Sequence, residues 1–177
     1  MERITDTHIF FWGSELSNWY TNGLRSQFKY KGITFFNSEQ AFMWEKAIFF
    51  GDTDTALKII KEGHDPKKSK ELGREVRNFN ANIWLKTSYD IMVAVNYEKY
   101  SQSSFLRNLL CETYPKTLVE ASPTDSIWGI GLHWSDDRVL DERKWQGRNL
   151  LGKALMDVRE KLITNEEKIY KTTINED

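Results

Sequence analysis

The chain has 177 residues, a length that suits one domain with a substantial core. Hydrophobic residues make up 40% of it and charged residues 29%, which is typical of a globular protein and excludes a disordered chain. The formal charge of −1, from 25 basic and 26 acidic residues, excludes a general attraction to nucleic acid but leaves room for a local basic patch.

Targeting and metal-binding patterns are weak in this sequence. No apolar run approaches the roughly 20 residues of a membrane span, and the first residues lack the pattern of a signal peptide, so we expect a cytoplasmic protein. The one cysteine, Cys111, excludes an internal disulfide and a multi-cysteine zinc site. Since His8, His64 and His133 are scattered, we expect no metal and no cofactor.

The first half of the chain changes from strand patterns to helix patterns. HIFFWG predicts a short strand, and SQFKYKGITFFNS predicts a hairpin around Gly32. SEQAFMWEKAIFF then predicts a helix capped by Asn37 or Ser38, followed by a second helix in DTDTALKIIKEG. A third helix begins with Asp65 as its cap and Pro66 at its first position and ends near Arg77.

The second half is also mostly helical. ANIWLKTSYDIMVAVNYEKY and QSSFLRNLLCETY predict a long and a short helix, TLVEA a strand, and SPTDSIWGIGLHWSDDR a turn-rich loop. Residues 149–162 predict a last helix, and residues 164–177 a polar tail. The fold class predicted is α+β: one helix-dominated domain over residues 1–177, with its core at about 9–163 and a small N-terminal antiparallel sheet or hairpin.

The stretch GRNLLGKA, from Gly147 to Ala154, has the glycine and lysine spacing of a phosphate-binding Walker A loop. A charged approach, DDRVLDERKWQ, precedes it instead of an apolar strand, and Ala154 lacks the hydroxyl that binds magnesium. We therefore expect no nucleotide triphosphatase. A helix that starts at Asn149 beside Arg148 and Lys153 still suits a general anion site.

Two further groups of residues carry possible chemistry. Glu39 and Lys46 are seven residues apart, which places an acid and an amine on one helix face about 10 Å apart. On sequence alone, a solvated helix face is the favoured explanation of this pair. Arg74 suits a phosphate or carboxylate or a plain surface position, and Asp125 lies in a loop shortly before Trp128, whose ring could stack on a base or simply pack.

Five segments in this order resemble the NADAR family, also called YbiA-like proteins. They are FFWGSELSNWY, ITFFNSEQAFMWEKA, LGREVRNFNANIW, LVEASPTDSIWGIG and GRNLLGKALMDVREKL, within residues 9–163. The resemblance implies an N-glycosidase that cleaves the bond between a phosphorylated ribose and a nitrogen. Its substrates would be ribosylamino-pyrimidine phosphate intermediates of riboflavin synthesis or ADP-ribose attached to guanine in nucleic acid.

The resemblance also implies roles for single residues. Glu39 would be the general acid or base, Lys46 would form a Schiff base with the ring-opened sugar, and Asp125 would hold a ribose hydroxyl or assist proton transfer. Trp128 would cover the base. The remaining substrate-binding candidates are Asn18, Arg74, Trp84, Gly129, Arg148, Asn149 and Gly152.

These expectations leave one alternative class open. A non-catalytic module that binds ADP-ribose or a nucleotide needs stacking and phosphate contacts but no acid and amine pair. The expected partner is a small phosphoribosyl or ADP-ribosyl substrate, with ADP-ribosylated nucleic acid as a further possibility and no membrane.

Overall fold

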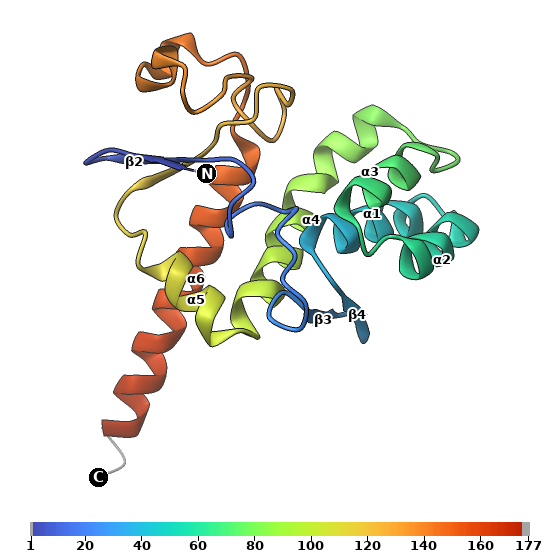
Figure 1. Ribbon diagram of the computed structural model, residues 1–177. Helices are drawn as coiled ribbons and strands as arrows, with labels where there is room; N and C mark the ends of the chain where they lie inside the picture. Colours follow the sequence, from blue (N-terminus) through green and yellow to red (C-terminus); the bar gives the residue numbers. More distant parts are fainter. Residues whose placement is uncertain (1, 175–177) are drawn as a thin grey trace. The chain divides into compact units, whose positions relative to one another are not determined.

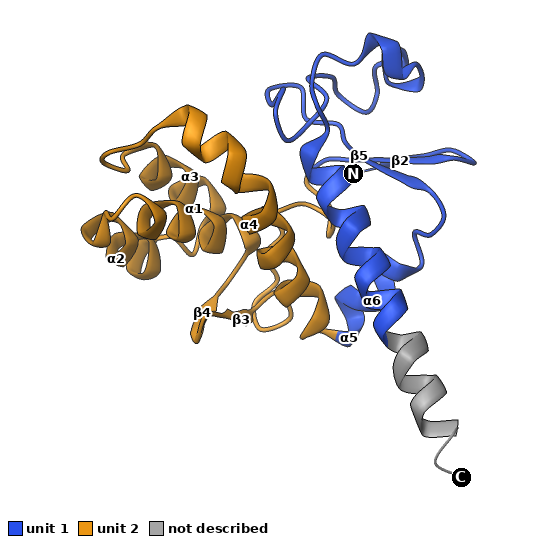
Figure 2. Ribbon diagram, turned by 180° about the vertical axis from the view of Figure 1, so that it is seen from behind, with its two compact units in different colours: residues 1–12, 104–177 blue, residues 13–103 orange. Residues whose placement is uncertain are grey.

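The computed structural model describes residues 2–174, with side chains described as far as Asn165. Figure 2 shows the chain divided into two compact units, each of which is described by itself. Unit 1 joins residues 1–12 to residues 104–177, and unit 2 is the continuous stretch 13–103. Across the described residues, no helix is both long and apolar enough to cross a membrane.

Unit 1 is built on a three-stranded sheet with the order β1-β2-β5. Its strands are β1 (Glu2–Ile4), β2 (His8–Phe11) and β5 (Thr117–Glu120). β1 pairs antiparallel with β2, whereas β2 pairs parallel with β5, so that Phe10 lies opposite Val119. The strands in HIFFWG and TLVEA are thus confirmed, while β1 and the pairing of chain-distant β2 and β5 had not been predicted.

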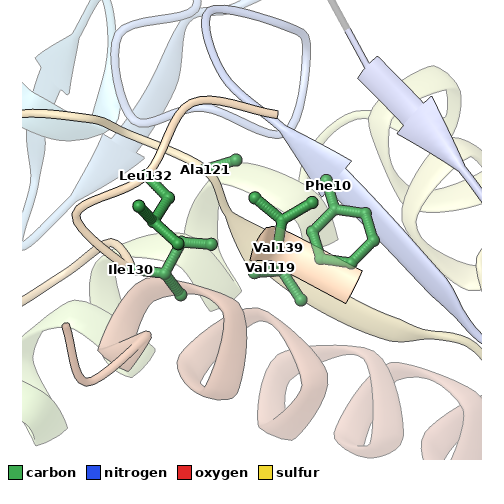
Figure 3. Packing of buried hydrophobic residues seen from close by; sticks show 6 residues of the cluster. All are labelled: Phe10, Val119, Ala121, Ile130, Leu132 and Val139. Atoms are coloured by element: carbon green, nitrogen blue, oxygen red, sulfur yellow. The ribbon is translucent and has the colours of Figure 1, made fainter. Parts of the chain in front are cut away.

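One core of unit 1 joins this sheet to the loop that follows it. Figure 3 shows the buried side chains that pack there: Phe10, Val119, Ala121, Ile130, Leu132 and Val139. The loop contains two short 3-10 helices, η1 (Asp137–Leu140) and η2 (Glu142–Lys144). Trp134 and Trp145 are partly buried and pack against this cluster, so both tryptophans have a structural use.

Two helices complete unit 1 (Figure 1). They are α5 (Ser104–Cys111) and the long α6 (Leu150–Ile174), which packs against β5 and α5. The predicted end of this last helix at Leu162 was wrong, because helical backbone continues through most of the polar segment. The final residues of the predicted tail, 175–177, lie outside the described residues.

Unit 2 begins with the predicted hairpin and continues as helices. β3 (Phe28–Tyr30) and β4 (Ile33–Phe35) pair antiparallel, and Lys31 and Gly32 turn the chain with φ values of 49° and 80°. The helices that follow are α1 (Ser38–Phe49), α2 (Thr53–Glu62), α3 (Pro66–Arg74) and α4 (Ala81–Ser101). The helix-dominated α+β class is confirmed.

The helix starts of unit 2 follow from side-chain caps. Asn37 accepts a hydrogen bond from the Gln40 N–H, and Asp65 accepts one from the Lys67 N–H with Pro66 at the first helical position. α1 packs against α2, α3 and α4. It is therefore buried continuously from Ser38 to Ala47, and its polar residues have to be accommodated inside the unit.

Lys99 on α4 is a fully buried amine in unit 2 that the sequence analysis had not singled out. Its Nζ donates to the Ser17 carbonyl at 3.1 Å and lies 5.0 Å from the centre of the Tyr100 ring and 5.7 Å from that of Tyr20. Burial lowers the pKa of Lys99 to about 7, against the opposing charge of Glu15.

We predict that Lys99→Met flattens the pH dependence of stability. Above about pH 7 the folded protein releases the Lys99 proton, whereas the unfolded chain keeps it to about pH 10.5. The free energy of unfolding of the unsubstituted protein should therefore rise by up to about 1.4 kcal/mol per pH unit between pH 7 and pH 10.5, and this rise should be missing in Lys99→Met. Below pH 7, Lys99 is protonated in both the folded and the unfolded state, so its titration should not change the free energy of unfolding. Urea unfolding of both proteins at several pH values in this window measures the difference, and parallel curves would contradict the prediction.

Candidate functional site

α1 carries an acid and an amine on one buried face. Glu39 in its first turn is 7% exposed, and Lys46 near its end is 9% exposed. The negative charge of Glu39 raises the pKa of the Lys46 amine, against the lowering effect of burial. The structure therefore excludes the alternative that this pair is an ordinary solvated helix face.

The start of α1 is fixed by a buried network of amides. The Glu39 N–H donates to the Asn18 carbonyl at 3.1 Å. The Asn18 side chain donates to Met92 Sδ at 3.0 Å and accepts from Asn96 Nδ2 at 3.2 Å, and Ser38 Oγ donates to Asn96 Oδ1 at 3.0 Å. Asn18, a predicted substrate-binding residue, thus has a direct part in holding the turn that carries Glu39.

The Lys46 amine is enclosed by a residue of α3 and a residue of the segment between α3 and α4. Its Nζ donates to the Gly73 carbonyl at 2.7 Å and lies 4.0 Å from the centre of the Phe79 ring. Burial lowers the pKa of Lys46, and the charge of Glu39 opposes this shift. A neutral amine is the form that can attack carbon, so a lowered pKa brings this lysine closer to its nucleophilic state.

Trp84 belongs to an aromatic cluster beside this amine. Its ring lies 5.2 Å from Phe42, 6.0 Å from Phe49 and 6.1 Å from Phe50, measured between ring centres. Phe50 in turn lies 5.4 Å from Phe79. Trp84, a predicted substrate-binding residue, is half-buried. It lies in the same unit as Glu39 and Lys46, within an aromatic surface that reaches Lys46 through Phe79.

The two arginines of the third predicted helix differ in their surroundings. Arg74 ends α3 and is exposed. Arg77 lies beyond the helix, where it donates to Asp52 Oδ1 at 2.6 Å and to Asp54 Oδ2 at 2.8 Å. These hydrogen bonds hold the pKa of Asp52 well below its usual range. Both arginines are exposed, but Arg77 has structural partners in Asp52 and Asp54.

The loop after β5 in unit 1 holds the second set of predicted residues. Asp125 Oδ1 accepts from the Ile127 N–H at 2.9 Å and from the Trp128 N–H at 2.8 Å, so it shapes the turn that presents Trp128. Both side chains are partly exposed. Gly129 is buried so tightly that a Cβ there would lie 2.9 Å from the carbonyls of Glu120 and Asp125.

Asn149 and Gly152 join α6 to β5. Asn149 is 1% exposed and has a φ of 53°. Its side chain accepts from the Glu120 N–H and donates to the Leu118 carbonyl, both at 2.9 Å, and so completes the hydrogen bonding of that strand. A Cβ on Gly152 would lie 2.1 Å from the Leu118 carbonyl. Both residues therefore have structural roles, whereas the family resemblance had placed them among the substrate-binding candidates.

The start of α6 does not offer the amide cradle that the anion-site prediction assumed. The N–H groups of Arg148, Asn149, Leu150 and Leu151 donate to the carbonyls of residues 126, 129, 127 and 128. These four donors are used within the unit. Arg148 and Lys153 are exposed beside them, so charge for a phosphate is available here from side chains.

The predicted residues thus form two groups, one in each unit. Glu39, Lys46, Asn18, Arg74 and Trp84 belong to unit 2, and Asp125, Trp128, Gly129, Arg148, Asn149 and Gly152 belong to unit 1. Sequence reasoning missed Gly73 and Phe79, which contact the Lys46 amine. The NFN stretch around Phe79 has no periodic pattern that could have indicated this contact. Among the side chains that the structure describes, no group of three or more His, Cys, Asp or Glu residues is arranged to hold a metal ion.

Comparison with known proteins identifies the family. The family model described as the NADAR domain matches residues 10–163. N-glycosidase R617 of Acanthamoeba polyphaga mimivirus is 41% identical over 165 residues, which cover 88% of this chain and 96% of that protein. Protein irg-1 of Caenorhabditis elegans is 42% identical over 163 residues, which cover 85% of this chain and 76% of that protein.

A solved structure agrees with these relatives. The NMR structure of the Escherichia coli protein YbiA has a TM-score of 0.72 and 27% sequence identity to this chain, and the match covers 93% of this chain and 89% of that one. YbiA is also named an N-glycosidase. The chain belongs to the NADAR family, as its motifs had indicated. Its class of enzyme is that of these named relatives, a hydrolase acting on N-glycosyl bonds.

We predict that Gly152→Ala destabilises unit 1 by about 1–3 kcal/mol, because the added methyl group collides with the backbone of β5. Glu160→Ala, at an exposed position of the same helix, is the matched control and should change the free energy of unfolding by less than about 0.5 kcal/mol. Urea unfolding followed by circular dichroism measures both, and equal midpoints for the two variants would show that α6 does not depend on this close approach.

Proposed function

We propose that this protein hydrolyses the N-glycosidic bond between a phosphorylated ribose and a heterocyclic or amino nitrogen. The observation that carries the proposal is the buried pair on α1, in which Glu39 acts on a lysine whose pKa is lowered by burial. A binding module needs stacking and phosphate contacts but no such pair, and burying an acid and an amine together costs stability.

Lys46 is the proposed nucleophile. In the ring-opened substrate, the sugar carbon C1 is double-bonded to the departing nitrogen. The lone pair of neutral Nζ adds to C1, and one Nζ proton passes to the departing nitrogen. That nitrogen takes a second proton from Glu39 and leaves as an amine when its bond to C1 breaks, so the sugar stays on Lys46 as a protonated Schiff base. Water then adds to C1 and gives one proton to Glu39. The proton of the new hydroxyl moves to Nζ as the C1–Nζ bond breaks, and the sugar leaves as an aldehyde.

The candidate binding side chains are proposed for each unit by itself. In unit 2, Trp84 is a proposed stacking partner for a flat base, and the exposed Arg74 is a proposed phosphate ligand. In unit 1, Trp128 is a proposed stacking partner, and Asp125 is a proposed acceptor for a ribose hydroxyl. Because the amides at the start of α6 are already used, the exposed cations Arg148 and Lys153 are the proposed phosphate ligands of this unit. Asn18, Gly129, Asn149 and Gly152 would support binding by fixing these segments.

Two leaving groups fit the proposal, and incubation with one substrate of each kind separates them. The first is a ribosylamino-pyrimidine phosphate, and the second is an oligonucleotide with ADP-ribose attached to guanine. Mass spectrometry should show base release from at least one of them. A steep fall in rate with salt on the oligonucleotide would indicate contacts with the nucleic acid backbone. Binding without release from either substrate would support a non-catalytic module instead.

We predict that Glu39→Gln lowers kcat by about 10²- to 10⁴-fold on the cleaved substrate, because the amide can neither give nor take the proton. The fold should be unchanged, since glutamine keeps the shape of the buried side chain. A circular dichroism spectrum and an unfolding curve serve as the control. Turnover at the rate of the unsubstituted protein would remove Glu39 from the mechanism.

We predict that borohydride traps the sugar on Lys46 during turnover. Reduction of the Schiff base leaves a stable secondary amine, which peptide mass spectrometry locates on the α1 peptide. Lys46→Met should abolish both trapping and turnover, whereas Lys58→Met, at an exposed position of α2, should leave both unchanged. Normal turnover by Lys46→Met would exclude covalent catalysis at this residue.

A further inference from the structure

The chain from the end of α3 to the start of α4 supplies two described contacts of the Lys46 amine. The Gly73 carbonyl accepts the hydrogen bond from Nζ, and the Phe79 ring lies beneath Nζ at 4.0 Å. A carbonyl oxygen and the face of an aromatic ring both attract positive charge. The amine therefore lies in a small cage that favours a cation, although burial disfavours one.

The Gly73 side of this cage lies at a close approach of α3 to α1. A Cβ on Gly73 would lie 2.0 Å from Met43 Sδ, so a larger residue at this position would displace the Met43 side chain. With glycine here, the Gly73 carbonyl lies 2.7 Å from Nζ.

The other end of the cage is anchored by an ion pair. The Arg77 backbone N–H donates to Asp52 Oδ2 at 2.9 Å, and its guanidinium donates to Asp52 Oδ1 and to Asp54. Asp52 is fully buried and also accepts from the Thr55 N–H at the start of α2. The residues just before Phe79 are therefore tied to α2 by charge-assisted hydrogen bonds.

Phe79 itself is not an ordinary core residue. Its side chain is 44% exposed, while its ring contacts Phe50 on one side and Lys46 on the other. Packing alone gives little reason for an aromatic ring at this half-exposed position, since a leucine would cover the same neighbours. The feature that an aliphatic side chain could not supply is the attraction between the ring face and a cation.

We propose that Phe79 is a positioning residue, held by the Arg77–Asp52 ion pair, which together with the Gly73 carbonyl stabilises positive charge on the Lys46 nitrogen. The inference rests on the proposed function of Lys46. That nitrogen carries positive charge in two forms, the ammonium and the protonated Schiff base, and the same ring and carbonyl serve both. The cage thus aims the nitrogen and supports the charged intermediate.

The test compares three substitutions in the full-length protein. Phe79→Leu keeps an apolar cover but removes the ring face, Phe79→Tyr keeps the ring, and Phe50→Leu removes a neighbouring ring of the same cluster. The pKa of the Lys46 amine is followed by NMR of protein labelled with ¹³C at lysine Cε, with Lys46→Arg to assign the signal. Phe79→Leu should lower this pKa by roughly 0.4 to 1.5 units, and the other two variants should leave it unchanged.

Activity provides a second readout on the substrate that is cleaved. Phe79→Leu should lower kcat by about 2- to 30-fold with a smaller change in KM, and Phe79→Tyr should restore it. Arg77→Gln should shift the pKa in the same direction as Phe79→Leu, since it releases the anchor of the ring.

The outcomes separate this inference from the proposed function. An unchanged or raised pKa in Phe79→Leu, or an equal shift in Phe50→Leu, would overturn the positioning role whatever the activity. If the unsubstituted protein cleaves neither substrate, the proposed function fails, yet the NMR titration still decides whether Phe79 stabilises charge on Lys46.

Discussion

The burial of α1 is the constraint on which unit 2 depends. A helix that packs against three others has no solvent-facing side for its polar residues, so each of them needs a partner inside the unit. Asn18 and Asn96 meet this need at the start of α1, and the Gly73 carbonyl and Phe79 ring meet it for Lys46 near the end. The contacts that hold the turn of Glu39 and the Lys46 amine thus come from a loop, from α3 and the residues after it, and from α4.

In unit 1 the main constraint is the attachment of the long helix α6 to β5, a strand that pairs with β2 on its other side. The Asn149 side chain takes the place of a neighbouring strand for Glu120 and Leu118, and Gly152 lets α6 approach the same backbone. The loop that carries Asp125 and Trp128 is then fixed from both ends. Asp125 shapes the turn of this loop, and the carbonyls of residues 126–129 accept hydrogen bonds from the amides at the start of α6. The position of Trp128 therefore follows from backbone hydrogen bonding that local sequence only hints at.

Local signals in the sequence predicted the helices and strands well, whereas contacts between residues far apart in the chain could not be predicted from them. The caps at Asn37 and Asp65 and the turn at Gly32 depend on neighbours within a few residues, so they could be predicted. The i, i+7 spacing placed Glu39 and Lys46 on one face, but their burial depends on α3 and α4 and could not be derived from that spacing. Phe79 was missed for the same reason, and the end of α6 was misplaced because a polar composition does not by itself stop a helix.

The start of α6 shows how one pattern can serve structure where it suggested ligand binding. GRNLLGKA has glycines because the backbones of β5 and of the loop lie within van der Waals distance of positions 147 and 152. Helix amides bind phosphate only when nothing inside the protein uses them, and here the loop carbonyls do. A phosphate that binds near this helix would interact with the exposed, flexible side chains of Arg148 and Lys153 in water. The helix dipole would still attract it, but the first amides of the helix are already hydrogen-bonded. Phosphate recognition of this kind contributes attraction and tolerates varied geometry. Discrimination between substrates would then depend on the rings proposed to stack on the base and on the enclosed amine proposed to react.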